Sequence, residues 1–215
     1  MAERVDYQMV RPPGWVHIPI GEHAKDVAAA FARTAVRSLP AEQRAAGHKL
    51  LVEYLDQTIA QAEEAGSQDL FFPGETLEGA VVPISIVAAF APTSAGRPEG
   101  SKMEALTAFS ARSSTSQVKN LGGEPAIRQF TDIPAQLNDE GQAIAPANRR
   151  VTYLVWTPTE TPRLMMFVGT IIRLDAEDAE DLIEALEFLF DTIMTTVRFT
   201  ASETVTDPAD AEQNA

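Results

Sequence analysis

The segment PRLMMFVGTIIRL, residues 162–174, constrains the fold more than any other stretch of the chain. Read as a β-strand, it has two sets of apolar side chains, one facing each way: Leu164, Met166, Val168 and Ile172 against Met165, Phe167 and Ile171. A strand that is apolar on both faces is buried on both faces. We therefore expect this strand to lie inside a sheet that has a covering layer on each side.

The segment DLIEALEFLFDTIMTTVRF, residues 181–199, supplies one covering layer as an amphipathic helix that runs into a short strand-like end. We expect Asp175 to be the N-cap of this helix. The carboxylates after Asp175 are favoured by the positive end of the helix dipole and by a solvated helix face. The helix carries one apolar stripe at helical spacing: Leu182, Ile183, Leu186, Leu189, Phe190, Ile193 and Val197.

The first third of the chain supplies the second covering layer. Residues 1–14 are polar and interrupted by proline, and they predict an N-terminal arm. WVHIPI, residues 15–20, alternates as an edge strand, where proline is tolerated. Two helices are expected next, at about 23–38 and 40–65, with Pro40 in the first turn of the second and Gly66 ending it. This helix pair, or a partner protein, would cover the other face of the sheet.

The middle of the chain has the period of strands separated by Pro and Gly. Strands are expected in residues 69–74 and 80–92, a hairpin at 117–133 that turns at Gly122-Gly123, and a second hairpin that joins RRVTYLVWT to residues 162–174. The remaining segments predict loops at 92–101 and 134–148 and a brief helix at 102–114.

These elements predict a single α+β domain over residues 15–200. Its core is a mainly antiparallel sheet of about six strands, covered by the C-terminal amphipathic helix on one face and the N-terminal helix pair on the other. Residues 201–215 are acidic and almost free of large apolar side chains, and they predict a disordered tail.

The charge of the chain excludes several classes of partner. A net charge of −14 and a pI near 4.6 disfavour binding to nucleic acid and to anionic lipid, which both require basic surfaces. No apolar stretch reaches the roughly 18 residues that span a bilayer. The chain has no cysteine, and its start has no signal-peptide pattern, so we expect a cytoplasmic protein, with export by a leaderless route left open.

Catalytic and metal-binding motifs are missing from the sequence. His17, His23 and His48 form no zinc-protease pair, and we expect them to be surface or capping residues. Ser85 has no Gly-x-Ser-x-Gly context and fits a small residue within a strand. GRPEGSK, residues 96–102, lacks the spacing of a phosphate-binding loop. We therefore predict no catalytic residue, no metal and no cofactor.

Trp15, His17, Tyr153 and Trp156 are the candidate contact residues. Aromatic side chains are enriched at the centres of protein interfaces, although aromatic residues in strands also belong to cores. Trp15 follows the PPG arm at an expected sheet edge, which favours exposure of its side chain.

Both ends of the domain carry a resemblance. PPGWVHIPI, residues 12–20, and ALEFLFDTIMTTVRF, residues 185–199, resemble a group of uncharacterised actinobacterial proteins, some of which accompany type VII secretion or polymorphic-toxin genes. The order of elements is also similar to the Mog1/PsbP-type α+β sandwich. The resemblance brings no catalytic residue with it, and it implies binding or scaffolding.

The sequence therefore favours a non-enzymatic interaction protein, of accessory or chaperone-like kind in a secretion system, whose partner is another protein or a second copy. Two alternatives stay open. One is a small-ligand binder or hydrolase with a site between the sheet and the N-terminal helices, using His17 or His23 with a carboxylate. The other is an obligate homodimer whose interface covers the second face of the sheet.

Overall fold

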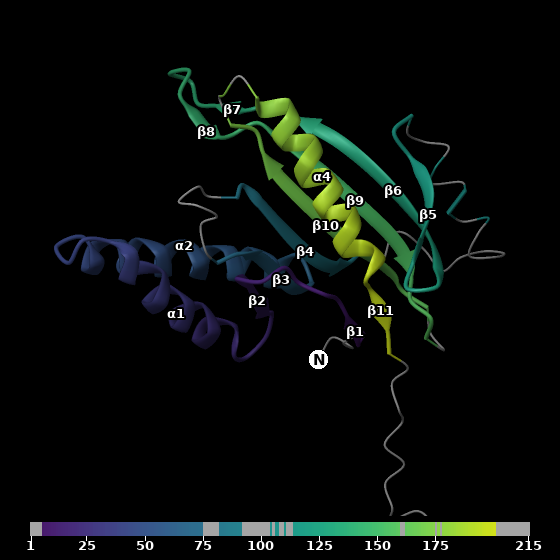
Figure 1. Cartoon of the computed structure of the whole chain (residues 1–215), viewed down its shortest axis with the longest axis horizontal. Coiled ribbons are helices and arrows are strands. Elements are labelled where there is room, and N and C mark those ends of the chain that lie inside the picture. Colours follow the sequence, from purple (N-terminus) through teal and green to yellow (C-terminus); the bar gives the residue numbers. More distant parts are fainter. Residues whose placement is uncertain are drawn as a thin grey trace, which may run out of the picture.

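The computed structural model is an α+β fold built on one antiparallel sheet of seven strands, in the order β2-β3-β4-β10-β9-β6-β5 (Figure 1). The sheet confirms the predicted class, with seven strands rather than about six. The strands are β2 (Trp15–Pro19), β3 (Ser67–Pro73), β4 (Ile84–Phe90), β5 (Gln117–Leu121), β6 (Glu124–Ile133), β9 (Asn148–Trp156) and β10 (Leu164–Ile172). The structure describes residues 6–74, 82–91, 104, 106, 107, 110, 114–159, 162–174, 176 and 178–200.

Strand β10 occupies the centre of the sheet, as its two apolar faces predicted. It pairs with β4 on one side and with β9 on the other, both antiparallel. Met165, Phe167 and Ile171 belong to the core under the C-terminal helix, whereas Leu164 and Met166 pack on the opposite face. The first face is therefore buried along the strand, whereas the second face is buried at Leu164, half-buried at Val168 and Thr170 and exposed at Ile172, so the predicted burial of both faces holds in full on one face and in part on the other.

Helix α4 (Ala179–Thr195) covers the first face, lying across β10, β9 and β6 (Figure 1). Its predicted stripe faces the sheet, with Ile183, Leu186, Phe190 and Ile193 buried. The helix begins at Ala179, later than predicted, and Asp178 at the N-cap makes no side-chain capping hydrogen bond. Asp175, the predicted cap, lies outside the described residues.

The helix pair covers the second face only in part, which corrects the prediction. Helices α1 (Ala24–Ala35) and α2 (Arg44–Glu64), joined by the 3-10 turn η1 (Val36–Ser38), pack on β2, β3 and β4. Small side chains such as Ala24, Ala28 and Ala32 bring α1 close to Ile18 and Leu70. The part of this face that β6, β9 and β10 form is in contact with Leu106 instead, which is buried and packs on Ile127 and Trp156.

The start of α2 also differs from the prediction. The helix begins at Arg44 rather than at Pro40, because residues 41–43 form a turn. Its end agrees: Gly66 follows with a φ of 69°, a left-handed conformation that glycine adopts without a steric penalty.

The N-terminal arm is anchored to the end of the domain. Strand β1 (Tyr7–Gln8) pairs with β11 (Arg198–Phe199) in a separate two-stranded sheet. The amide of Val10 also donates to Oγ1 of Thr196 at 3.0 Å. The strand-like end predicted after α4 therefore holds the arm in place rather than extending the main sheet. The predicted tail, residues 201–215, lies outside the described residues.

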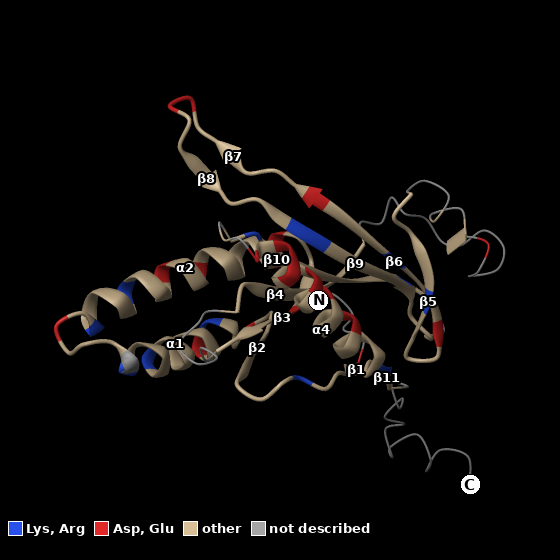
Figure 2. Ribbon diagram, turned by 45° about the horizontal axis from the view of Figure 1, so that its top comes forward, with Lys and Arg blue, Asp and Glu red and all other residues tan. Residues whose placement is uncertain are grey.

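The loop predicted at 134–148 contains a small hairpin, which corrects that prediction. Strands β7 (Gln136–Leu137) and β8 (Ala143–Ala145) pair with each other and project away from the main sheet (Figure 2). Sequence alone missed them because each is only two or three residues long. The predicted loop at 92–101 and most of the predicted helix at 102–114 lie outside the described residues.

Candidate functional site

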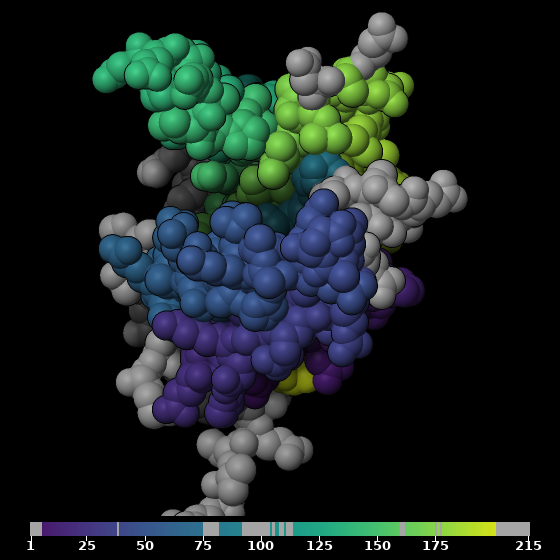
Figure 3. Space-filling view, turned by 90° about the vertical axis from the view of Figure 1, so that its left-hand side faces the viewer, coloured from purple at the N-terminus to yellow at the C-terminus, as the bar shows by residue number. Residues whose placement is uncertain are grey.

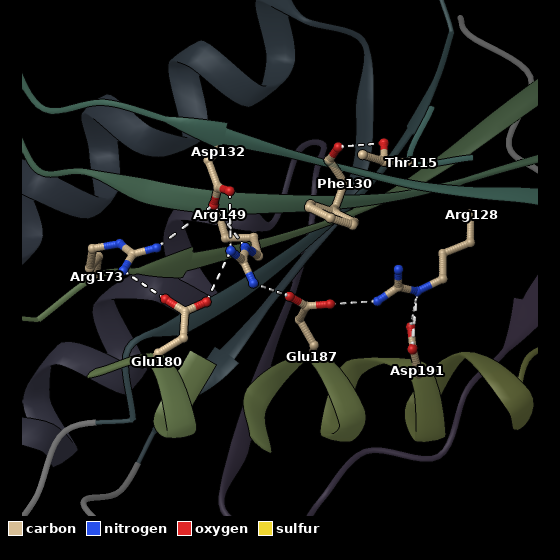
Figure 4. Close-up of polar contacts among 9 residues, drawn as sticks. All are labelled: Thr115, Arg128, Phe130, Asp132, Arg149, Arg173, Glu180, Glu187 and Asp191. Atoms are coloured by element: carbon tan, nitrogen blue, oxygen red, sulfur yellow. Dashed lines mark hydrogen bonds and ion pairs between the residues drawn. The ribbon is translucent and has the colours of Figure 1, made fainter. Parts of the chain in front are cut away.

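An ion-pair network joins α4 to the sheet and is the largest polar cluster of the described side chains (Figure 4). At one end, Nη2 of Arg128 donates to Glu187 at 2.7 Å, and Nε donates to Asp191. At the other end, Arg149 donates to Asp132 at 2.8 Å and to Glu187 at 2.8 Å. Further contacts join Arg149 and Arg173 to Glu180 at 3.1 and 2.8 Å.

The network stabilises the charges of its own members. Burial opposes the charge of Arg128, but its hydrogen bonds to Asp191 and Glu187 outweigh burial and raise its pKa. A hydrogen bond from Arg149 lowers the pKa of Asp132. Burial, followed by the charge of Asp191, raises the pKa of Tyr153, whose hydroxyl donates to Asp191 at 3.0 Å. Because these groups satisfy one another, the network acts as a structural clamp between α4 and the sheet.

A second polar group lies at the edge of the sheet, where β2 and β3 meet the N-terminal arm. Nε2 of His17 lies 2.6 Å from Oδ1 of Asp69, and the hydroxyl of Tyr7 donates to Oδ2 at 2.8 Å. The side chain of Asp69 is 3% exposed and that of His17 is 29% exposed. The imidazole stacks on Phe71, with ring centroids 4.6 Å apart and an interplanar angle of 10°.

Strand register explains this meeting. Phe71 is the direct partner of His17 across β2 and β3, and Asp69 is the partner of Pro19, so His17 reaches Asp69 diagonally on one face of the sheet. A cavity of about 390 Å³ adjoins the pair and is lined by Asp6, Tyr7, Gln8, Met9, Arg11, His17, Asp69 and Phe71. The arm therefore forms one wall of a small polar pocket.

The third feature is an apolar groove on the opposite face, between α2 and strands β4 and β10. It has a volume of about 510 Å³, and no described residue that lines it is charged. Leu51, Tyr54 and Leu55 contribute the helix side, and Ile86, Val87 and Ile172 are among those on the sheet side. Figure 3 shows the surface hollowed beside the blue α2, where the green strands lie beyond it.

The predicted contact residues lie in different environments. Tyr153 and Trp156 are 4% and 2% exposed, so both belong to the interior and neither side chain is available to a partner. Trp15 is half-buried and packs against the core under α4, so its predicted exposure is only partial. His17 lines the cavity beside the N-terminal arm.

The prediction of surface or capping histidines is wrong for His17 and holds only in part for His48, which is half-buried with its Nε2 atom buried. His17 is a partner of a buried carboxylate rather than a surface residue, whereas His23 is exposed and lies 3.8 Å from Asp26. The pocket of His17 is not between the sheet and the N-terminal helices. Strand alternation turns Val16 and Ile18 toward those helices and His17 away from them.

Sequence analysis missed Asp69 and Tyr7 as parts of a site. A usable signal was present: Asp69 is the one charged residue in the strand SQDLFFP, where a carboxylate must be buried with hydrogen-bond donors. Tyr7 had no such signal, because its position depends on the pairing of β1 with β11.

The described part of the chain contains neither a cluster of metal-binding side chains nor a membrane-spanning helix. Among the residues with described positions, no group of three or more His, Asp or Glu side chains is arranged to hold a metal ion. No described helix combines the length and apolar character that crossing a membrane requires.

Comparisons with known proteins identify no family. No protein-family model matches the chain, and no curated protein matches it. A crystal structure from Bacteroides thetaiotaomicron VPI-5482 is similar with a TM-score of 0.30 and 13% sequence identity. The alignment covers 63% of this chain and 39% of that one, so it spans well under half of the other protein's length. A likeness of this extent indicates neither a shared function nor a family for this chain.

Proposed function

We propose that this protein is a non-enzymatic interaction protein that binds an apolar segment of another protein in the groove between α2 and the sheet. The supporting observation is the groove itself, which is about 510 Å³ in volume and lined without a charged side chain among the described residues. Apolar grooves of this kind accept the apolar face of an amphipathic helix.

The rim of the groove carries exposed apolar side chains that suit such a partner. Tyr54 is 65% exposed on the helix side, and Ile172 is 38% exposed on the sheet side. Scattered exposed apolar residues need no explanation, but these lie along one hollow. Aromatic side chains at such positions often contribute most of the binding energy.

The charge of the chain selects the kind of partner segment. With a net charge of −14, the protein repels acidic segments and attracts basic ones. We propose an amphipathic segment with an apolar face for the groove and with Lys or Arg on its flanks. Electrostatic attraction of this kind mainly accelerates association and weakens with salt.

The sequence resemblance supplies the biological setting of the proposal. Residues 12–20 and 185–199 resemble actinobacterial proteins encoded near type VII secretion or toxin genes, and the element order is similar to Mog1/PsbP-type sandwiches. We propose a cytoplasmic accessory or chaperone-like factor that shields an apolar segment of a secretion-system protein from water.

Site-specific photo-crosslinking tests the proposal. A photoreactive phenylalanine analogue is placed at Tyr54 and, as a matched control, at Val118, which is 55% exposed on strand β5 at the opposite end of the sheet. In cells that express the native gene neighbourhood, position 54 should capture a defined protein that position 118 does not. With that protein purified, Tyr54→Glu should weaken binding at least about tenfold, or 1.4 kcal/mol.

Two results would count against this function. Equal capture at the two positions would show that the groove has no preferred partner. Capture of a second copy of the chain, with a mass in light scattering that rises with concentration, would instead support the homodimer alternative.

A further inference from the structure

We propose that the pocket beside His17 and Asp69 binds a small zwitterion of the amino-acid type. The inference does not depend on the proposed groove function, because the pocket and the groove lie on opposite faces of the sheet. It rests on three properties of the pocket: a buried carboxylate, an oriented imidazole and a wall with charges of both signs.

The carboxylate of Asp69 is buried beside the cavity, where it accepts hydrogen bonds from His17 and Tyr7. Asp69 lies between Gln68 and Leu70 in β3, with its side chain 3% exposed. Burial of a charge opposes folding, and a pair such as His17–Asp69 is seldom more stable than apolar side chains of the same size. Because the pair lies beside a cavity, a ligand in the cavity can reach it, and we attribute the pair to ligand recognition.

The carboxylate of Asp69 determines which ring nitrogen of His17 donates a hydrogen bond. Oδ1 of Asp69 accepts the Nε2–H of His17 at 2.6 Å, and stacking on Phe71 holds the plane of the ring. In the tautomer that carries its proton on Nε2, Nδ1 is an acceptor, and Nδ1 has no hydrogen-bond partner among the described residues. A ligand of this pocket should therefore carry a strong donor.

The arm adds a cation and an anion to the wall of the cavity. Arg11 and Asp6 both line it and are both exposed at its rim. A guanidinium binds a carboxylate through two parallel hydrogen bonds. An ammonium group has three donors, which suit the carboxylate of Asp6 and Nδ1 of His17. A ligand with both groups on a short skeleton matches this wall better than a simple anion or a simple amine.

The size and composition of the cavity fit binding rather than covalent catalysis. A volume of about 390 Å³ lies within the range of small-molecule pockets, and Met9 and Phe71 provide apolar contact for a side chain. None of the described residues that line it has an aliphatic hydroxyl or a thiol that could serve as a nucleophile beside the imidazole.

Calorimetric titration of the full chain tests the proposal. The probes are glycine, L-alanine and L-glutamine, with L-lactate and L-alaninamide as analogues that lack the ammonium or the carboxylate. At least one amino acid should bind, and the matching analogues should bind at least about tenfold more weakly. Arg11→Ala and His17→Gln should each weaken binding about tenfold or more, whereas His23→Gln, at an exposed histidine, should leave it unchanged.

Three outcomes would overturn the inference: no amino acid binds at millimolar concentration, L-lactate binds as tightly as L-alanine, or Arg11→Ala and His17→Gln have no effect. Asp69→Asn keeps the shape of the side chain and should also abolish binding. If that variant does not fold, Arg11→Ala and Asp6→Asn carry the test, because both alter exposed side chains at the rim.

Discussion

The Nε atom of Arg128 donates to both carboxylate oxygens of Asp191, at 2.8 and 3.0 Å, and so joins β6 to α4 across the covered face of the sheet. The side chain of Arg128 is 7% exposed, and the same guanidinium also donates to Glu187. The amphipathic helix is therefore held by an oriented polar clamp as well as by its apolar stripe.

Asp191→Ala should destabilise the protein by about 2–3 kcal/mol, because it leaves the buried Arg128 with one carboxylate fewer and removes the acceptor of Tyr153. The value lies below that of a fully buried pair because Asp191 is 33% exposed. Urea unfolding measures the change. Arg173→Gln, at the exposed end of the network, should change the unfolding free energy by about 0–1 kcal/mol. Equal effects of the two substitutions would contradict a clamp centred on Arg128.

Tyr153 should make the protein sensitive to alkaline pH. Burial, together with the charge of Asp191, raises the pKa of Tyr153 above that of the unfolded chain. A group with a raised folded-state pKa stabilises the fold fully below its unfolded pKa, near 10, and this contribution is lost as pH rises toward the folded value.

Unfolding free energies measured between about pH 8 and 11 should therefore fall more steeply for the wild type than for Tyr153→Phe. A parallel absorbance titration should show that Tyr153→Phe lacks the tyrosine ionisation that occurs at the highest pH in the folded protein. Identical pH slopes for the two proteins would show that the raised pKa of Tyr153 is not linked to folding.

Gly169→Ala should destabilise the protein by about 1–3 kcal/mol through overpacking. A methyl group at this position of β10 would lie 3.0 Å from ring atoms of Phe190 on α4, so the buried ring would have to shift by a few tenths of an ångström. Phe190→Leu removes the ring, so the double variant should be more stable than the sum of the two single effects predicts. Additive effects in this double-mutant cycle would mean that the ring does not limit the space at Gly169.

The hairpin turn between β5 and β6 offers a matched pair of glycines. Gly122 and Gly123 have φ angles of 63° and 91°, which disfavour any other residue. A Cβ at Gly122 would also lie 3.0 Å from the ring of Phe199, whereas a Cβ at Gly123 would meet open space. Gly122→Ala should therefore be more destabilising than Gly123→Ala, by about 1 kcal/mol in thermal or urea unfolding. The reverse order would show that conformational strain outweighs the contact with β11.

The layered architecture could be predicted because its signals are local. The alternation in residues 162–174 predicts burial on both faces, which the structure has in full on one face and in part on the other, and the spacing from Leu182 to Val197 shows which face of α4 is buried. The hairpin at Gly122-Gly123 was also predictable, since only a few residue types tolerate its backbone angles. The two-residue strands and the start of α2 were not, because short elements depend on their surroundings more than on their own sequence.

The sequence by itself therefore determined that this chain builds a layered sheet with a central strand apolar on both faces, because this follows from the period of apolar residues along one segment. Only the tertiary structure decided which polar side chains meet. His17 and Asp69 are 52 positions apart, and Arg128 and Asp191 are 63 apart. Their contacts depend on strand order and register, which are set by the packing of the whole domain and leave no periodic signal in the residues themselves.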